Sequence, residues 1–302
     1  MTRRLPVLRA LVAPPRGAFA LAVIALVALA ALVSLVWLPA DPNHASAYDA
    51  WLPPSPGHWL GTDGSGRDIA ARLIAGSRVT VLVVLGAVVL SGLIGLALAV
   101  AAGLGPRWLR EPLAVAIDVL IAFPTLLLAI MLAAAFGSGI PVVIAAVGVG
   151  FGVAIARVVR AELRQVSSHD YVLAARAAGL GRWAILRTHL LPGAMPVFTV
   201  QLSLSAGLAI LAEAGLSYLG FGAPPRVPSW GRMLAETQAY IGVHPLVVLW
   251  PGLAITVTVL AFFLLGDALR EASDPALRGR AADRALPDRG RPDRAGAAEA
   301  GR

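Results

Sequence analysis

Residues 79–103 read VTVLVVLGAVVLSGLIGLALAVAAG and contain no charged side chain. As an α-helix this stretch would be about 37 Å long, which exceeds the roughly 30 Å hydrocarbon core of a bilayer. Lipid offers no hydrogen-bond partner to the backbone, so a spanning segment must be a helix or part of a closed barrel. Barrel strands are about half this length and alternate in polarity. The stretch therefore predicts a transmembrane helix.

Five further apolar stretches have the same character. They are 17–39, 113–136, 138–156, 197–219 and 247–266. The first exceeds the roughly 7–15 apolar residues of a signal-peptide core, which indicates an uncleaved anchor. The sequence thus predicts an all-α, polytopic integral membrane protein with six transmembrane helices.

The composition supports this fold class and excludes others. Hydrophobic residues make up 58% and charged residues 14% of the 302, with a mean hydropathy of +0.78, which argues against a soluble globule. There is no cysteine, so thiolate metal sites and a cysteine nucleophile are excluded. The formal charge of +8 comes from arginines scattered over many segments, without the basic face expected of a nucleic-acid partner.

The arginines predict the orientation. With six spans, 20 of them lie on the side of the two termini and 5 on the other side. Because arginine is enriched in cytoplasmic loops, both termini are expected in the cytoplasm. We therefore divide the chain into a cytoplasmic N-terminus (1–16), a transmembrane domain (17–278) and a tail (279–302) that is too polar to offset the entropy of ordering.

The longest segment on the inner side, 157–196, is helix-prone. Ser167 and Asp170 have the spacing of a capping box, and Gly179 stands where a helix would end. Between them one face carries an apolar stripe of mostly small residues at helical spacing, formed by Tyr171, Ala174, Ala175 and Ala178. A second helical stretch, 182–190, then leads to Pro192. Such a face fits either a surface helix lying on the bilayer or a plug for a groove in a soluble partner.

The spacing Ala174-Ala175-x3-Gly179-x9-His189-Leu190-Leu191-Pro192 resembles the EAA motif of the membrane subunits of ATP-binding-cassette (ABC) importers, with Leu173 in place of Glu and His189 in place of Ile. Five segments also resemble, in order, the C-type permease of the dipeptide, oligopeptide and nickel importer family. They are HWLGTDGSGRDIAARLIAGSRVTVLV (58–83), IAFPTLLLAI (121–130), SHDYVLAARAAGLGRWAILRTHLLPGAMP (168–196), ILAEAGLSYLGFGAPPRVPSWGRMLAE (210–236) and WPGLAITVTVLAFFLLGDALREASDPALR (250–278).

This resemblance implies a type I ABC importer permease fold in the inner membrane of a bacterium. The implied partners are a second homologous permease, two cytoplasmic ABC ATPase subunits, an extracytoplasmic solute-binding protein and membrane lipid, but no nucleic acid. The implied substrate is a di- or oligopeptide, or a related solute such as nickel. The chain itself contains no G-x-x-x-x-G-K-[ST] motif, so it is expected to be non-catalytic and to need no cofactor, while ATP and Mg²⁺ bind the partner ATPases.

The resemblance also implies which residues transmit the motion of the ATPases. Asp170 to Gly179 would form the coupling helix, and Leu191-Pro192 the turn that returns to the fifth span. The implied coupling residues are Asp170, Tyr171, Leu173, Ala174, Ala175, Ala178, Gly179, Leu191 and Pro192.

Three residues within the spans are candidates for the translocation pathway. Asp118 is expected either to pair with an arginine such as Arg110 or Arg157 or to act in transport. Glu213 lies among small residues, where three roles are equal alternatives: lining the pathway, binding a peptide amino group or a cation, and bracing two helices. Pro124 should kink the third span. One alternative function is a proton-coupled secondary transporter using Asp118 and Glu213. Another is a non-transporting membrane anchor or receptor subunit that presents the inner loop to a soluble regulator.

Two small-residue motifs and the outer loops complete the predictions. Ser91-x3-Gly95 and Gly148-x3-Gly152 permit close helix approach. On the outer side, the candidate residues are Asp63, Arg67, Asp68 and Trp230. The first three are expected to tie a glycine-rich turn to a short helix beginning near Ile69. The region lacks the alternating oxygen ligands of a calcium loop, and the five histidines lack ligand spacing, so no metal site is predicted.

Overall fold

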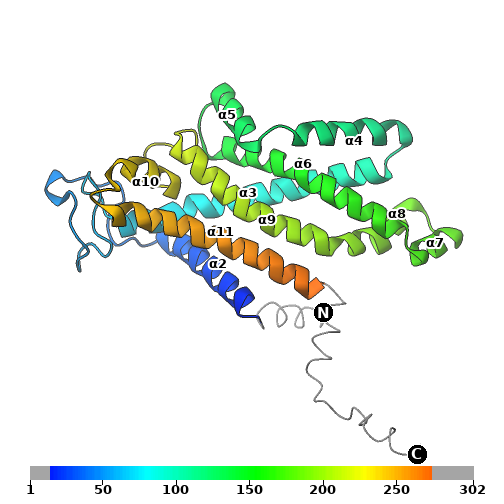
Figure 1. Ribbon diagram of the computed structural model, residues 1–302, viewed down its shortest axis with the longest axis horizontal. Helices are drawn as coiled ribbons and strands as arrows, with labels where there is room; N and C mark the ends of the chain where they lie inside the picture. Colours follow the sequence, from blue (N-terminus) through cyan, green and yellow to red (C-terminus); the bar gives the residue numbers. More distant parts are fainter. Residues whose placement is uncertain (1–13, 274–302) are drawn as a thin grey trace, which may run out of the picture.

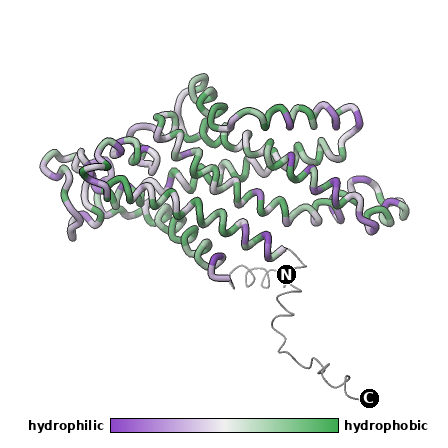
Figure 2. The backbone as a smooth tube through the Cα atoms, viewed as in Figure 1, coloured by the Kyte–Doolittle hydropathy of each residue, from purple (hydrophilic) through white to green (hydrophobic). Residues whose placement is uncertain are grey.

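The computed structural model describes residues 14–273. Their regular structure is helical, apart from one isolated antiparallel bridge between Thr62 and Asp68. The long helices lie side by side in an elongated bundle (Figure 1). Apolar residues predominate along the bundle and polar residues gather towards its two ends (Figure 2). Residues 1–13 and the predicted tail 279–302 lie outside the described residues.

Five helical stretches are long and apolar enough to cross a membrane. They are α2 (Pro15–Ser34), α3 (Ile69–Leu104), α6 (Ile140–Ser167), the stretch Arg182–Tyr218 and α11 (Pro245–Ser273). Arg182–Tyr218 combines α8 (Arg182–Ile185), the π-helical segment η2 (Leu186–Leu190) and α9 (Leu191–Tyr218). Each overlaps one predicted span. The short helix predicted near Ile69 is instead the first part of the 36-residue α3, because no proline interrupts the sequence from Ile69 to Leu104.

The third predicted span is not one kinked helix. It consists of α4 (Arg107–Ile121) and α5 (Thr125–Phe136), which are bent by 88°. Pro124 has no backbone N–H and disfavours helical geometry at Phe123, and its own ψ of 124° is extended. The break is therefore much sharper than an ordinary proline kink, and α5 projects from the bundle (Figure 1). The bent pair together could still form a sixth, broken span.

Helices α3 and α6 pack closely through the predicted small residues. A Cβ atom added to Gly95 would lie 2.6 Å from Ile155, and one added to Gly148 would lie 2.7 Å from Leu90. A Cβ atom on Gly152 would similarly lie 2.9 Å from Ile94. Larger side chains would push the two helices apart, which confirms that these motifs permit close approach.

The bundle has two distinct ends. At one end lie the segment 35–68 with η1 (Ala47–Asp49), then α10 (Trp230–Thr237) and η3 (Gln238–Tyr240). At the other end lie α7 (Asp170–Ala177) and α8 (Figure 1). Arg16 forms an ion pair with Glu271, so α2 begins beside the place where α11 ends. We refer to the end with α10 as the outer end and the end with α7 as the inner end.

Candidate functional site

The segment 157–196, which we call the coupling segment, begins as a continuation of α6. The helix runs to Ser167, and the Ser167 hydroxyl donates a 2.7 Å hydrogen bond to the Arg164 carbonyl oxygen. Helix α7 starts only at Asp170, with His169 at its N-cap. The predicted capping box is therefore wrong, because Ser167 already belongs to the preceding helix and its hydroxyl is used within it.

The end of α7 matches the prediction that Gly179 terminates the helix. Gly179 has φ of +84°, and its N–H donates to the Arg176 carbonyl oxygen at 3.0 Å. The N–H of Leu180 reaches back to the Ala175 carbonyl oxygen at 3.1 Å, which completes a Schellman motif. A Cβ atom on Gly179 would meet no atom within 4 Å. The positive φ, and not a lack of space, is thus what favours glycine here.

Helix α7 is anchored on one side and open on the other. Val172 is fully buried in an apolar cluster that includes Leu163, Ile185 and Leu186. Tyr171, Ala174 and Ala178 are exposed, and Ala175 is partly exposed. Leu173 is also 48% exposed. The predicted apolar face is therefore accessible to a partner, while Val172, which the sequence did not single out, attaches the helix to the bundle.

The return to the membrane differs from the prediction. Leu191 and Pro192 are the first residues of α9 and form no turn, since η2 and α9 are continuous. The π-helical segment closes with a hydrogen bond from the Leu191 N–H to the Leu186 carbonyl oxygen. This wider turn lets the proline enter without breaking the helix. The aromatic ring of His189, in η2, stacks 5.9 Å from the ring of Tyr171 and so connects η2 with α7.

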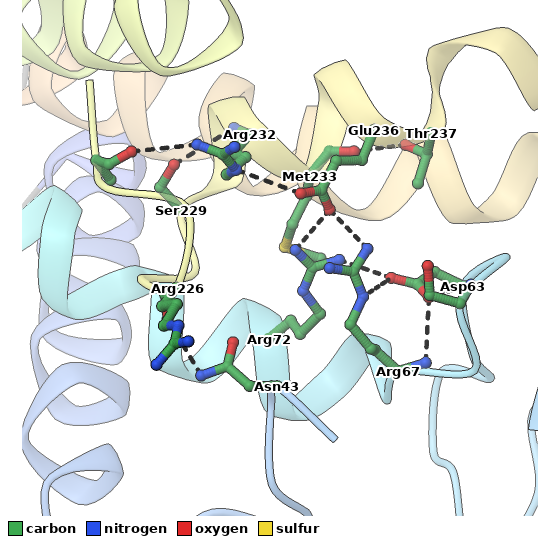
Figure 3. Close-up of polar contacts among 12 residues, drawn as sticks. Asn43, Asp63, Arg67, Arg72, Arg226, Ser229, Arg232, Met233, Glu236 and Thr237 are labelled. Atoms are coloured by element: carbon green, nitrogen blue, oxygen red, sulfur yellow. Dashed lines mark hydrogen bonds and ion pairs between the residues drawn. The ribbon is translucent and has the colours of Figure 1, made fainter. Parts of the chain in front are cut away.

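At the outer end, five charged residues form a network that we call the outer clasp. They are Asp63, Arg67, Arg72, Arg232 and Glu236 (Figure 3). Asp63 Oδ2 lies 2.6 Å from Arg72 Nη1 and 2.9 Å from Arg67 Nε. Glu236 Oε2 lies 2.7 Å from Arg72 Nη2 and 2.8 Å from Arg67 Nη2. Two arginines from the first outer segment and the start of α3 thus hold a carboxylate of α10.

The arginines of the outer clasp determine the ionisation of Glu236. Its partial burial alone would raise the pKa of this carboxyl group. The positive charges of Arg72, Arg67 and Arg232 outweigh that effect and hold the pKa of Glu236 below its usual value of 4.5. Glu236 is therefore ionised at neutral pH, as the geometry of the outer clasp requires.

Three hydrogen bonds outside the outer clasp reinforce this end of the molecule. Asp68 caps α3 by accepting a 2.7 Å hydrogen bond from the Ala71 N–H, which confirms the predicted link between the turn and the helix. Trp230 is buried and its indole N–H donates to the Leu73 carbonyl oxygen at 2.9 Å. Ser229 caps α10 in the same way that Asp68 caps α3. The sequence singled out Asp63, Arg67, Asp68 and Trp230 but missed Arg72 and Glu236.

The pathway candidates lie in different environments. Asp118 Oδ1 is 3.6 Å from Arg157 Nε, with both side chains more than half exposed, so the arginine pairing is confirmed with Arg157. Glu213 is 1% exposed and accepts a 2.6 Å hydrogen bond from the Ser217 hydroxyl, whose oxygen also accepts from the Ala223 N–H. This chain of contacts holds the loop after α9 on the end of the same helix, and it does not connect Glu213 to a second helix.

The three candidates do not form a common site. No ion pair or hydrogen bond links Asp118 with Glu213 in the part of the chain that the structure describes. Pro124 lies at the break between α4 and α5. Among residues 14–273 no group of three or more histidine, aspartate and glutamate side chains could hold a metal ion.

Comparison with known proteins identifies relatives over most of the chain. The family described as "Binding-protein-dependent transport system inner membrane component" matches residues 91–279. The glutathione transport system permease protein GsiD of Pectobacterium atrosepticum is 39% identical over 272 residues, covering 90% of this chain and 89% of the relative. The nickel transport system permease protein NikC of Escherichia coli K12 is 39% identical over 259 residues, covering 85% of this chain and 93% of the relative.

Two more comparisons agree with these. The dipeptide transport system permease protein DppC of Alkalihalophilus pseudofirmus is 36% identical over 225 residues, covering 74% of each chain. Among solved structures, a chain of the inward-facing MetNI methionine ABC transporter superposes with a TM-score of 0.57 and 19% identity. It covers 67% of this chain and 97% of that chain, so the two share a fold.

Proposed function

The chain belongs to the family of inner membrane components of binding-protein-dependent transport systems, and on this premise we propose that α7 couples it to separate ATPase subunits. The chain is a membrane-spanning permease subunit of an ABC importer. Its relatives are transport permeases, which agrees with a non-catalytic role and gives no support to a proton-coupled secondary transporter.

The observation that carries this proposal is the exposure of the apolar face of α7. A helix that only stabilised its own bundle would bury that face, but α7 buries Val172 and leaves Ala174 and Ala178 accessible. Small side chains let a partner approach the helix backbone closely. Because α7 lies between α6 and α8–α9, a force on it would reach two transmembrane helices.

The proposed assembly contains this chain, a second homologous permease, two cytoplasmic ATPases that bind ATP and Mg²⁺, and an extracytoplasmic solute-binding protein. The inner end faces the cytoplasm, as the excess of arginine on that side indicates. The outer end then meets the solute-binding protein. The substrate is a short peptide or a related small solute, since the relatives carry names for dipeptide, glutathione and nickel transport.

The pathway candidates enter this proposal with different roles. Glu213 braces the outer end of α9 through Ser217. The break at Pro124 lets α4 and α5 move separately during alternating access. Asp118 holds α4 to α6 through Arg157 at the surface of the chain.

Uptake by proteoliposomes that contain the assembled transporter tests the proposal. In vesicles whose lumen corresponds to the cytoplasm, solute should accumulate only when ATP is enclosed in the lumen. Ala175→Arg, on the apolar face, should abolish uptake and solute-stimulated ATP hydrolysis while the permease remains inserted. Ala177→Arg places the same side chain on another exposed side of α7 and should retain both activities. Normal stimulation in Ala175→Arg would contradict the coupling role.

A further inference from the structure

A polar cavity at the inner end of the molecule is lined by arginines. Its volume is about 510 Å³, and the lining includes Arg110 of α4, Arg164 of α6, Arg176 of α7 and Arg182 of α8. No acidic side chain lines it. None of the four forms an ion pair with an acidic side chain among residues 14–273. We call this cavity the arginine pocket.

The arginine pocket has unused hydrogen-bond donors. Arg110 Nε is buried and has no acceptor within the described part of the chain, while Arg110 Nη2 only reaches the Gly105 carbonyl oxygen at 3.3 Å. Four converging guanidinium groups without a carboxylate repel one another. A bound anion with several oxygen atoms would satisfy the free donors and remove that repulsion, and guanidinium groups pair especially well with phosphate.

A second cavity continues from the arginine pocket along the bundle. This apolar groove has a volume of about 720 Å³, shares Leu104 and Arg182 with the arginine pocket, and extends to Leu93 on α3. From Leu93 to Leu104 the helix rises about 16 Å, which matches the roughly 15 Å depth of one bilayer leaflet. Small side chains, Ala97 and Ala101, form part of its wall.

The position of the groove agrees with the level of the membrane surface. Trp183, which lines the groove at its polar end, is 74% exposed, and Trp108 on α4 is 75% exposed. Tryptophan is enriched where lipid headgroups meet the acyl chains. The arginine pocket thus lies at headgroup depth and the apolar groove at acyl-chain depth.

We propose that the arginine pocket and the apolar groove form one binding site for an anionic phospholipid of the inner leaflet. The phosphate headgroup would contact Arg110 and Arg182, and an acyl chain would lie in the groove against Ala97 and Ala101. Basic pockets beside the cytoplasmic ends of transmembrane helices are suited to anionic headgroups. Because Arg176 belongs to α7, the lipid would also contact the proposed coupling helix. Placement in the inner leaflet rests on the proposed orientation.

Lipid selectivity of the assembled transporter tests this site. The probe is phosphatidylglycerol, compared with phosphatidylcholine, and its retention on the purified complex is quantified by native mass spectrometry. The double variant Arg110→Gln/Arg182→Gln should reduce the preference for phosphatidylglycerol about 25-fold, which corresponds to about fivefold for each charge. Arg107→Gln/Arg187→Gln removes two exposed arginines at the same end that do not line the pocket, and it should change the preference for phosphatidylglycerol less than twofold.

Two further variants keep the test decisive if the glutamine pair disturbs folding. Arg110→Lys/Arg182→Lys retains both charges and should keep most of the preference. Ala97→Trp/Ala101→Trp fills the apolar groove without touching a charge, and should lower phosphatidylglycerol retention about as much as the glutamine pair. An unchanged preference in both the glutamine and tryptophan variants would overturn the proposal.

Two further experiments separate the lipid from a free anion and from a protein partner. Inorganic phosphate at millimolar concentration should leave phosphatidylglycerol bound, whereas complete displacement would indicate a site for free phosphate and contradict the lipid assignment. The glutamine variant should still co-purify with the ATPase subunits. If the glutamine variant lost the ATPase subunits but retained phosphatidylglycerol as before, the pocket would bind a protein partner and the lipid assignment would be wrong. Lipid binding is measured without transport, so its failure would not affect the proposed coupling role of α7.

Discussion

The two ends of the bundle are built in opposite ways. At the outer end, segments that lie far apart in the sequence are joined by the partly buried ion pairs of Glu236 with Arg67 and Arg72 and by the hydrogen bond from Trp230 to Leu73. At the inner end, α7 is attached by one buried valine and one aromatic stack, and it leaves its apolar face open. The outer end is therefore stabilised within this chain, whereas the inner end leaves an apolar face accessible, as the proposed coupling role requires.

The largest effect should come from breaking the outer clasp. Arg72→Ala would remove the charged contacts to Asp63 and Glu236, while Arg67 still pairs with Asp63. A hydrogen bond to a charged group contributes about 1.5–3 kcal/mol, so the free energy of unfolding should fall by about 3 kcal/mol. Thermal unfolding of the purified complex measures the change. Arg226→Ala removes an exposed side chain at the same end and should have almost no effect. Equal stability of the two variants would mean that the outer clasp does not stabilise this end.

A smaller effect is expected from loosening the inner end. Val172→Ala removes buried methyl groups and should cost about 2 kcal/mol, chiefly by local detachment of α7. Hydrogen exchange of the α7 amides should accelerate, and solute-stimulated ATP hydrolysis should fall. Leu173→Ala shortens a half-exposed side chain and should not accelerate exchange as much. If the α7 amides exchanged at the same rate in both variants, Val172 would not be the residue that attaches α7 to the bundle.

The third effect tests the conformation that ends α7. Gly179→Val places a β-branched residue at φ of +84° and should destabilise the Schellman motif by about 1–2 kcal/mol. Gly179→Asn should be tolerated, since asparagine adopts this conformation readily. Coupling efficiency, measured as solute transported for each ATP hydrolysed, should therefore fall in the valine variant only. A loss with asparagine as well would point to contact between a partner and Gly179.

The smallest effect concerns pH and the outer clasp. The pKa of Glu236 is lowered in the folded protein, so the ion pairs stabilise the fold fully above about pH 4.5 and lose this contribution as pH falls through the folded pKa. The difference in apparent Tm between the unsubstituted protein and Glu236→Gln should be constant from pH 7 to 5.5 and shrink below 4.5. A difference that persists unchanged at pH 3 would show that charge is not the source of the stabilisation.

The comparison also shows which features the sequence could reveal. Apolar runs and the glycine at 179 act locally, so hydropathy and helix-capping rules located the spans and the end of α7. The outer clasp depends on Arg72 and Glu236, which are 164 positions apart, and nothing local relates them. Pro124 was visible as a helix breaker, but a proline alone does not fix the direction of the next helix, and the 88° bend and the burial of Ala129 and Ala133 in α5 were not predictable from it. Val172 looked like any other apolar residue of its helix.

Site-specific crosslinking tests the central claim most directly, because the chain contains no cysteine and a single one can be introduced without background. A cysteine at Ala174, on the open face of α7, should crosslink to an ATPase subunit of the assembled transporter, and the yield should change when ATP binds. A cysteine at Val243, exposed at the outer end, should give no such product. Crosslinks from Ala174 only to lipid or to this chain itself, in every nucleotide state, would contradict the coupling role of α7.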